Sequence, residues 1–310
     1  MKQATVTDSQ LSPMPTFAPN PSSLSAAIAS NRQHTLARPV AVSGTGLHTG
    51  AAVTCHLQPA PAKTGRTFVR VDLEGQPAIA ASLANAVPAQ LSTLLQQGEA
   101  QVRTIEHLMA ALAGCSVDNC RIELNGPEAP ILDGSALPWI EAIAEAGIAA
   151  QEAERVQIAI AQPLTVWEGD AFVSGVPSPQ TRYTYGIDFA NCPIGEQWLS
   201  WVEGPEQFRE EIAPARTFAT EVQARQALEL GLIKGGSLES AIVCNEREWL
   251  TPLRFSDEPV RHKLIDLLGD LSLAGVRWQG HFIAYKASHT LHGRFAQQLL
   301  ADASRLTSRS

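Results

Sequence analysis

The sequence contains one helix-forming run in which a histidine and two carboxylates recur every four residues. This run is His262-Lys-Leu-Ile-Asp266-Leu-Leu-Gly-Asp270. Positions four apart on an α-helix are separated by about 40° around its axis, so His262 and Asp266 share one face and can hold one ion from adjacent turns. The aliphatic residues between them would pack the helix against a sheet. Taken alone, a His-x-x-x-Asp pair is more often a solvated salt bridge than a metal site, so the rest of the chain must decide.

Composition narrows the class of protein. The chain has 310 residues, of which 45% are hydrophobic and 17% charged, so it can bury a full core, and its length fits two domains better than one. A net charge of −8 argues against a general nucleic-acid or anionic-membrane surface. The five cysteines are scattered and never spaced as Cys-x-x-Cys, which fits a reducing cytoplasm. No apolar run is long enough to span a membrane. We therefore expect a cytoplasmic globular protein with no nucleic-acid partner and no transmembrane segment.

Residues 1–33 have a composition that differs from the rest of the chain. They are rich in serine, proline, alanine and asparagine and have little periodic apolar content. We expect a disordered extension here, with structure beginning near Thr35. The segment lacks the apolar core behind a basic start that marks a secretory signal, whereas a transit peptide stays open because acids are few.

A glycine-rich stretch, residues 43–50, lies between two expected strands at 36–42 and 52–57. A phosphate-binding loop must open a helix, and this stretch opens a strand, so it is expected to be a hairpin. Its glycines could bring His48 close to a ligand, or His48 could be an exposed residue of an ordinary turn. The spacing alone leaves both open.

The stretch around Glu106 and His107 is predicted to be a strand running into a helix. Thr104 is expected as the N-cap and Gly114 as the C′ residue. Glu106 and His107 then lie in the first helical turn at the end of a strand. In metal-dependent hydrolases a metal ligand and a general base must be about one water molecule apart, which neighbouring positions on one turn allow.

A polar stretch at 151–155 is the expected boundary between two domains, at 34–150 and 155–305. Before it, Asp133 is either an ordinary turn residue or a carboxylate that orients a ligand histidine. After it we expect strands at 156–161, 165–167, 171–175, 181–189, 241–244 and 281–287. Helices are expected at 220–230 and 291–304, the second capped by Ser288.

Several ordered motifs resemble one known family. They are Ser43-Gly-Thr-Gly-Leu-His-Thr-Gly50, Thr104-Ile-Glu-His-Leu-Met-Ala-Ala-Leu-Ala-Gly114, Asn125-Gly-Pro-Glu, Ile131-Leu-Asp-Gly-Ser135, Ala215-Arg-Thr-Phe218, Gly235-Gly-Ser237, His262-Lys-x-x-Asp266-x-x-Gly-Asp270 and Tyr285-Lys-x-x-His289. Together they resemble UDP-3-O-acyl-N-acetylglucosamine deacetylase, a zinc enzyme at the committed step of bacterial lipid A biosynthesis. The resemblance runs from about Thr35 to about Leu300. It does not include the N-terminal extension, and residues 196–210 match the family's pattern only loosely.

The resemblance implies an α+β fold of two βα domains with similar topology that sandwich the active site. By their motif positions, three residues match the zinc ligands: His107, His262 and Asp266. Glu106 matches the general base. Thr217 and His289 match the groups that stabilise the oxyanion beside the zinc, and His289 also matches the acid that protonates the leaving amine. Asp270 matches the carboxylate that orients it, and substrate contacts are implied at Lys263, Phe218, Gly236 and His48.

Two effects on the pKa of His289 oppose each other. A histidine near a helix N-terminus has its charged form disfavoured by the helix dipole, whereas the implied acid must be an imidazolium. A nearby carboxylate raises a histidine's pKa, so Asp270 would resolve this conflict. Lys263, next to a zinc ligand, would attract the diphosphate of a nucleotide sugar.

The segment 218–245 is an insertion by the family's pattern. Its helix carries Ala224, Ala227, Leu228 and Gly231 on one face, with Leu230, Leu232 and Ile233 adding bulk. The pattern alone fits a small satellite core, whereas the resemblance favours a passage that encloses the substrate's acyl chain. The length of that chain is left open, and a monomer is expected.

Two other functions stay open at this point. Two histidines and a carboxylate also form the facial triad of non-haem iron enzymes, although a glutamate beside the first ligand suits hydrolysis better. The chain could also be a binding protein that has lost activity on the same fold. The joint presence of Glu106, Thr217, Asp270 and His289 argues against that.

Overall fold

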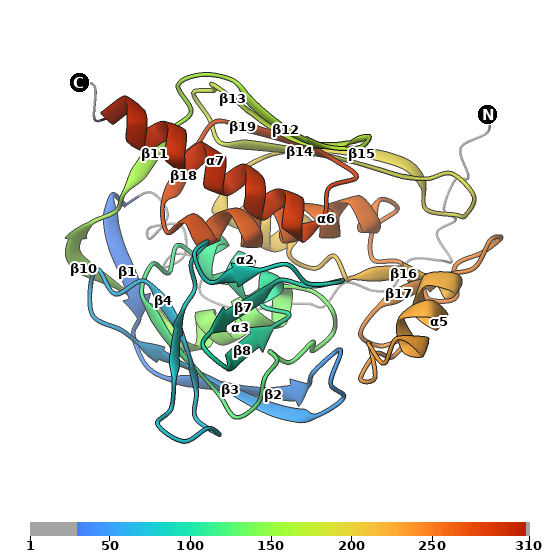
Figure 1. The fold of residues 1–310 in the computed structure, drawn as a ribbon, viewed down its shortest axis with the longest axis horizontal. Helices are drawn as coiled ribbons and strands as arrows, with labels where there is room; N and C mark the ends of the chain where they lie inside the picture. Colours follow the sequence, from blue (N-terminus) through green and yellow to red (C-terminus); the bar gives the residue numbers. More distant parts are fainter. Residues whose placement is uncertain (1–29, 308–310) are drawn as a thin grey trace.

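Two five-stranded sheets form the outer layers of the fold, and helices fill the space between them (Figure 1). The computed structural model describes residues 30–307, so most of the predicted extension, residues 1–29, lies outside the described part. The last two residues of the predicted extension, Arg32 and Gln33, belong to β1 (Arg32–Leu36). This strand pairs antiparallel with β10 (Ile148–Glu154).

The first sheet has the strand order β2-β3-β9-β4-β5. All its pairs are antiparallel except β9–β4, which is parallel. Its inner face is apolar because alternate strand residues such as Cys55 and Leu57 are fully buried. The strands are β2 (Val40–Thr45), β3 (Ala52–Pro59), β4 (Arg66–Arg70), β5 (Ala78–Ala80) and β9 (Cys120–Leu124).

The second sheet repeats this topology. Its order is β12-β13-β19-β14-β15, and again only the pair at the same place in the order, β19–β14, is parallel. The expected α+β fold with two units of similar topology is therefore confirmed. The sequence itself has no internal repeat that would reveal it. The strands are β12 (Leu164–Glu168), β13 (Ala171–Val176), β14 (Arg182–Phe189), β15 (Gly195–Val202) and β19 (His281–Tyr285).

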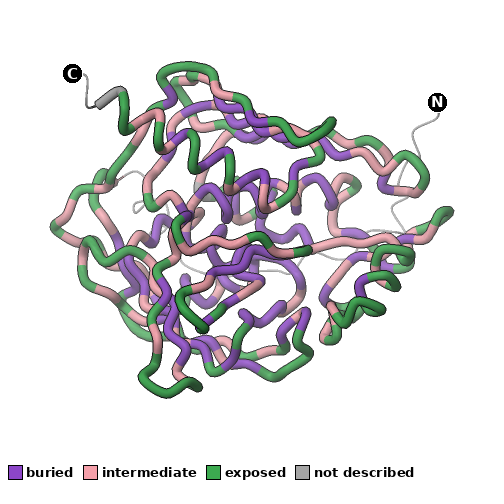
Figure 2. The backbone as a smooth tube through the Cα atoms, in the orientation of Figure 1, coloured by how far each residue is buried: buried purple, intermediate pink, exposed green. Residues whose placement is uncertain are grey.

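Four helices lie between the sheets. They are α2 (Glu106–Gly114), α3 (Leu137–Ala146), α6 (Glu258–Leu271) and α7 (His289–Thr307). In each half, one helix precedes the last strand of the sheet and one follows it, so α2 corresponds to α6 and α3 to α7. The helices α2 and α6 lie in the middle of the molecule and are almost wholly buried (Figure 2). One continuous apolar core spans both halves.

Smaller elements complete the structure. A three-stranded sheet contains β6 (Ala86–Val87), β7 (Leu94–Gln97) and β8 (Ala100–Arg103), and a parallel pair joins β11 (Gln157–Ala159) to β18 (Arg277–Gln279). The expected insertion contains β16 (Phe218–Thr220), α5 (Glu221–Glu229) and β17 (Ile242–Cys244). The remaining turns are α4 (Pro205–Gln207), a π-helix η2 (Phe208–Ile212) and a 3₁₀-helix η3 (Ser272–Ala274). In residues 30–307 no helix is both long and apolar enough to cross a membrane.

Several local predictions were wrong. The strand expected at 36–42 is two strands, because Pro39 cannot continue a ladder. The polar stretch 151–155 lies mostly in strand β10, and its role as the boundary between domains 34–150 and 155–305 stays a prediction. Thr104 does not cap α2. It has a positive φ, and its hydroxyl donates to the carboxylate of Glu128 instead.

Gly114 is also not the left-handed C′ residue of α2, since it is the last helical residue and its φ is not positive. The reason for a glycine here is the ring of Phe208, because a Cβ at position 114 would overlap that ring. Other predicted details are confirmed. Residues 43–50 form a hairpin between β2 and β3, and Thr220 and Gln223 make a capping box at the start of α5.

Candidate active site

Three potential metal ligands meet where α2 crosses α6. His107 lies in the first turn of α2, and His262 and Asp266 lie on successive turns of α6. The two histidine Nε2 atoms are 3.2 Å apart, and Asp266 Oδ1 is 3.4 Å from His262 Nε2 and 3.9 Å from His107 Nε2. All three side chains are buried. The structure therefore brings together the ligand set that the motifs implied.

The donor atoms of this cluster fit a cation. Asp266 Oδ1 is buried and has no hydrogen-bond partner among the described residues, which is costly for a carboxylate oxygen. Ligand atoms about 2.0–2.1 Å from a tetrahedral zinc ion are roughly 3.3 Å apart, close to two of the three separations here. Burial lowers the pKa of His107 to about 3 and also lowers the pKa of His262, so both imidazoles are neutral ligands at physiological pH.

Neighbouring groups orient these ligands. His262 Nδ1 lies 3.1 Å from the carbonyl oxygen of Ala215, which can only accept, so Nδ1 carries the proton and Nε2 is left for the metal. The ammonium group of Lys263 donates to Asp266 Oδ2 at 2.7 Å, which turns Oδ1 toward the histidines. Burial raises the pKa of Asp266, but the charge of Lys263 outweighs it and holds that pKa well below its usual range.

Glu106 lies beside the cluster in a buried position. Burial raises its pKa to about 7, which is suited to a group that must take a proton near neutral pH. Its Oε2 accepts a hydrogen bond of 3.0 Å from the backbone N–H of Thr93. The carboxylate is thus held in place by a segment outside α2.

His289 is the first residue of α7 and its Nδ1 donates to Asp270 Oδ2 at 2.8 Å. Burial lowers the pKa of His289, but Asp270 and Asp266 outweigh it and raise that pKa to about 9. The imidazolium is therefore the main form at neutral pH, as expected from the carboxylate. Ser288 accepts from the backbone N–H of Leu291, which confirms the expected cap.

Sequence reasoning missed two members of this site. The Thr93 hydroxyl donates to Asp270 Oδ1, and His292 Nδ1 lies 2.8 Å from Asp270 Oδ2. His292 could have been found, because it lies three residues after His289 on a helix and therefore on a neighbouring part of its surface. Nothing in the sequence around Thr93 distinguishes it from an ordinary strand residue.

Two buried carboxylates connect the predicted motifs to the site. Glu128 accepts from the backbone N–H groups of His48 and Thr49 at 2.8 Å, and from the Thr104 hydroxyl just before α2. Glu258, the first residue of α6, forms a bidentate pair with Arg216 at 2.9 and 3.2 Å. Each carboxylate thus fixes a loop to the N-terminal end of a helix that carries site residues.

Asp133 stabilises a turn. Its Oδ1 accepts from the backbone N–H of Ser135 at 2.9 Å, and its Oδ2 pairs with Arg254 at 2.8 Å. It makes no contact with a ligand histidine in the described residues. Of its two alternatives, the structure supports the ordinary turn residue.

The family follows from comparison with known proteins. The sequence model of UDP-3-O-acyl N-acetylglycosamine deacetylase (LpxC) matches residues 33–301. The chain belongs to this family. The matched range contains every residue of the candidate site described above.

Relatives named UDP-3-O-acyl-N-acetylglucosamine deacetylase align over most of their length. The protein of Thermosynechococcus vestitus is 51% identical over 268 residues, which are 86% of this chain and 93% of the relative. That of Nostoc sp. is 50% identical over 276 residues, 87% of this chain and 99% of the relative. That of Geobacter sp. is 43% identical over 270 residues, 86% of this chain and 88% of the relative.

A cavity of about 1110 Å³ leads from the site of this deacetylase family member into the insertion. One end is lined by Thr217, His262, Lys263, Asp266 and His289. The other end is mainly apolar and is lined by residues of β16, α5 and the chain that follows, among them Phe218, Ala224, Ala227, Leu228, Leu230, Leu232, Ile233 and Val243. The insertion thus forms the wall of a cavity next to the site.

The predicted substrate contacts differ in position. Lys263, Phe218 and Gly236 line the cavity. His48 does not, although its neighbour Leu47 does. His48 is buried, its Nε2 has no hydrogen-bond partner among the described residues, and its Nδ1 lies 3.5 Å from the backbone nitrogen of Ile233. His48 therefore lies behind the cavity wall, at the base of the insertion.

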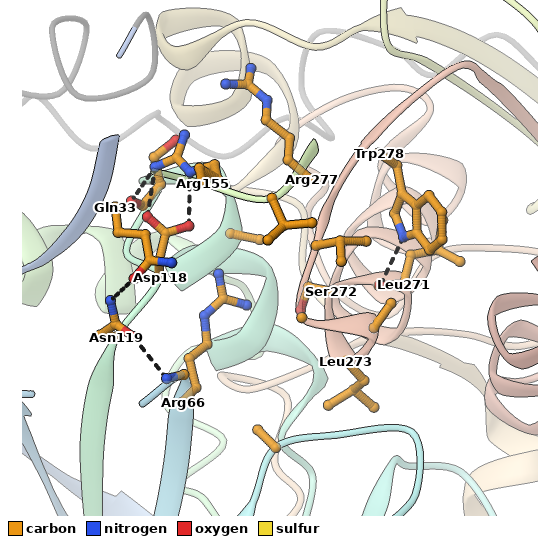
Figure 3. A pocket seen from close by; sticks show the side chains of 18 of the residues that line it. Gln33, Arg66, Asp118, Asn119, Arg155, Leu271, Ser272, Leu273, Arg277 and Trp278 are labelled. Atoms are coloured by element: carbon orange, nitrogen blue, oxygen red, sulfur yellow. Dashed lines mark hydrogen bonds and ion pairs between the residues drawn. The ribbon is translucent and has the colours of Figure 1, made fainter. Parts of the chain in front are cut away.

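A second cavity, of about 520 Å³, lies at the carboxyl-terminal end of α2 and α6 (Figure 3). Its charged groups are largely engaged with protein: Arg155 makes two bonds of 2.8 Å with Asp118, and Arg66 donates to the Val117 carbonyl at 2.9 Å. None of the predicted site residues lines it. Several of them line the first cavity instead.

Proposed function

We propose that this chain hydrolyses the N-acetyl group of UDP-3-O-acyl-N-acetylglucosamine with zinc bound by His107, His262 and Asp266. The products are acetate and the free amine, which makes the reaction the committed step of lipid A biosynthesis. One observation carries the proposal. A buried ligand triad, a glutamate with a pKa of about 7 and a histidine with a pKa of about 9 are grouped beside a long apolar cavity. We further propose that the enzyme acts in the cytoplasm as a monomer.

The chemistry divides between the metal and the protein. Zinc, when bound, supplies Lewis acidity toward the acetamide oxygen and the attacking water. Glu106 accepts a proton from that water as the water oxygen forms a bond with the acetamide carbon. The His289 imidazolium donates its Nε2 proton to the amide nitrogen as the C–N bond breaks, and Asp270 holds the ring by its Nδ1. Thr217, which lines the same end of the cavity, is proposed to donate to the acetamide oxygen.

The direction of His289 supports its role as the acid. Its Nδ1 is occupied by Asp270, whereas its Nε2 is 3.9 Å from Asp266 Oδ2, on the side of the ligand triad. The proton that it can give away is therefore on the side where the scissile bond must lie. Glu106 approaches from α2 and His289 from α7, so acid and base come from different halves of the fold.

The cavity fits a substrate that carries a fatty acyl chain. Its far end is lined by aliphatic and aromatic side chains of the insertion, and burying a methylene group contributes about 0.8 kcal/mol. Lys263 lies at its near end and is proposed to bind the diphosphate. That contact must compete with its present bond to Asp266. Phe218 and Gly236 are proposed to contact the sugar or the start of the acyl chain, and His48 to support Leu47 from behind.

Acetate release tests this proposal. Purified enzyme is incubated with UDP-3-O-acyl-N-acetylglucosamine and with the same compound lacking the acyl chain, and acetate is measured. We expect release from the acylated compound, a loss of kcat in Glu106→Gln, and a loss of roughly 10²-fold or more in His289→Ala. Absence of acetate from the zinc-loaded wild-type enzyme, or wild-type turnover in Glu106→Gln, would overturn the assignment.

A further inference from the structure

Thr93 makes hydrogen bonds to two groups that have opposite roles in the proposed reaction. It is buried and immediately precedes β7, in the segment that follows β6. Its backbone N–H donates to Glu106 Oε2 at 3.0 Å, and its hydroxyl donates to Asp270 Oδ1. The same hydroxyl oxygen lies 3.2 Å from His289 Nδ1. One residue thus contacts the proposed base, the proposed acid and the carboxylate between them.

The partners fix the direction of the hydroxyl. Asp270 Oδ2 also accepts hydrogen bonds from the Nδ1 atoms of His289 and His292, both at 2.8 Å. An ionised carboxylate has only lone pairs to offer, so the Thr93 hydroxyl proton points at Oδ1. The lone pairs of the hydroxyl oxygen then face His289 Nδ1–H, which is shared between Thr93 Oγ1 and Asp270 Oδ2.

This arrangement restrains the imidazole in two directions. With one acceptor, a ring can swing about its hydrogen bond. With acceptors on both sides of Nδ1–H, the ring plane is fixed, and Nε2 is kept on the side of the ligand triad. The Thr93 N–H meanwhile directs one oxygen of Glu106. A displacement of about 1 Å in such groups can cost about a hundredfold in rate, so this fixation matters for turnover.

We propose that Thr93 is a positioning residue that sets the acid and the base of this site relative to each other. The inference rests on the proposed function, because it assigns Thr93 a part in that reaction. Thr93 belongs to the first half of the chain, and Asp270 and His289 belong to the second. The residue therefore adds a second link between the two halves, beside the crossing of α2 and α6.

Two substitutions separate the hydroxyl from the backbone contact. Thr93→Val keeps the shape and the N–H and removes the hydroxyl, whereas Thr93→Ser keeps both hydrogen bonds. A hydrogen bond to a charged group is strong enough that we expect Thr93→Val to lower kcat roughly ten- to a hundredfold. KM and the zinc content should stay within about twofold of wild type, and Thr93→Ser should restore most of kcat. If the valine variant does not fold, Thr93→Ala and Thr93→Ser give the same comparison.

Two further comparisons test whether the effect of Thr93→Val comes from its place in this site. In an Asp270→Asn background, Thr93→Val should cost less than it does in the wild type, because the hydroxyl and Asp270 restrain the same Nδ1–H of His289. Thr165→Val is the matched control. Thr165 on β12 also bonds through its hydroxyl, to Ser174, but lies away from the site, so its kcat should not change. Full additivity with Asp270→Asn, wild-type kcat in Thr93→Val, or an equal loss in Thr93→Ser would each overturn the inference. A zinc-loaded wild-type enzyme that releases no acetate would overturn the proposed function and the inference with it.

Discussion

Gly269 of α6 packs against the backbone carbonyl of Glu106 on α2 so closely that a Cβ at position 269 would overlap that oxygen. The contact brings α6, with His262 and Asp266, to the turn of α2 that carries Glu106 and His107. Helices that cross with ordinary side chains between them have axes about 8–10 Å apart, and a glycine allows a closer approach. The distances within the ligand triad therefore depend on a residue that has no side chain.

Substitution of this glycine tests that dependence. In Gly269→Ala, the new methyl group must push α6 from α2, because backbone atoms cannot move aside like the end of a flexible side chain. We expect weaker zinc binding, a kcat lowered by roughly tenfold or more, and destabilisation of about 1–3 kcal/mol. Zinc affinity, turnover and urea denaturation check it.

Gly293 in α7 provides the control. A Cβ there would meet nothing within 4 Å. Gly293→Ala should leave zinc binding and turnover unchanged and stabilise the protein by roughly 0.5–1 kcal/mol, since alanine is the better helix former. Wild-type zinc affinity in Gly269→Ala would contradict the account of the helix crossing.

The pH dependence of kcat/KM should be bell-shaped. Activity rises as Glu106 loses its proton and falls as His289 loses its proton, because the base works ionised and the acid works protonated. The pKa of Glu106 is about 7 with no metal ion beside it, and bound zinc lowers that pKa, so the acid limb should lie between 4.5 and about 7. The alkaline limb should lie at or below the pKa of about 9 of His289.

Asp270→Asn removes the charge that raises the pKa of His289. Its alkaline limb should therefore move to lower pH, while the acid limb changes less. Asp302→Asn, at a half-buried position on α7 in the last turns of the helix, serves as the control and should leave both limbs in place. The assignment of His289 as the acid fails if the alkaline limb is the same in Asp270→Asn and wild type.

Much of the site could be predicted because its residues lie in local patterns. The pair His262 and Asp266 follows from helical spacing, and the early turn of α2 places Glu106 beside His107. The meeting of these two pieces could not be derived from spacing, since it depends on the packing of two helices 155 residues apart in sequence. The resemblance to a known family bridged that gap.

The predictions that failed have physical reasons in long-range contacts. Threonine is a favoured N-cap residue, but the hydroxyl of Thr104 donates its hydrogen bond to Glu128 instead. The positive φ of Thr104 also excludes the cap geometry. The role of Thr93 could not be predicted for the same reason, because its two acceptors, Glu106 and Asp270, lie on α2 and α6.

The buried pair of Arg216 and Glu258 is expected to be important for stability. Glu258 also accepts from the backbone N–H of Arg254, and Arg216 adjoins Ala215, whose carbonyl orients His262. Glu258→Ala leaves a buried guanidinium without its carboxylate, which should cost about 3–5 kcal/mol. Zinc affinity should fall as well, and urea denaturation with metal analysis measures both.

An exposed ion pair of α5 is the matched control. Arg225 and Glu221 lie four residues apart on that helix, with side chains 69% and 50% exposed. Glu221→Ala should change the unfolding free energy by only about 0.5 kcal/mol. Similar effects of the two substitutions would show that Glu258 has no special role.

The insertion should determine the preference for acylated substrate. Burying even half of a ten-carbon chain contributes several kcal/mol at about 0.8 kcal/mol per methylene, so kcat/KM should fall by a few orders of magnitude without the chain. Phe218→Gln, Leu230→Gln and Leu232→Gln, all in the cavity wall, should reduce this ratio without loss of zinc. Leu73→Gln, in the turn between β4 and β5, is the control. Equal kcat/KM for both substrates in the wild-type enzyme would exclude an acyl passage.

Titration of metal-depleted enzyme with zinc tests the central claim most directly. The enzyme is stripped with a chelator, dialysed and titrated under anaerobic conditions, and acetate release from UDP-3-O-acyl-N-acetylglucosamine is measured against bound zinc. We predict that activity is absent at the start, rises linearly and saturates near one equivalent, whereas His107→Ala, His262→Ala and Asp266→Ala bind zinc weakly and remain inactive. Full acetate release from the stripped enzyme, or tight binding of one equivalent by these variants, would contradict the assignment of the site.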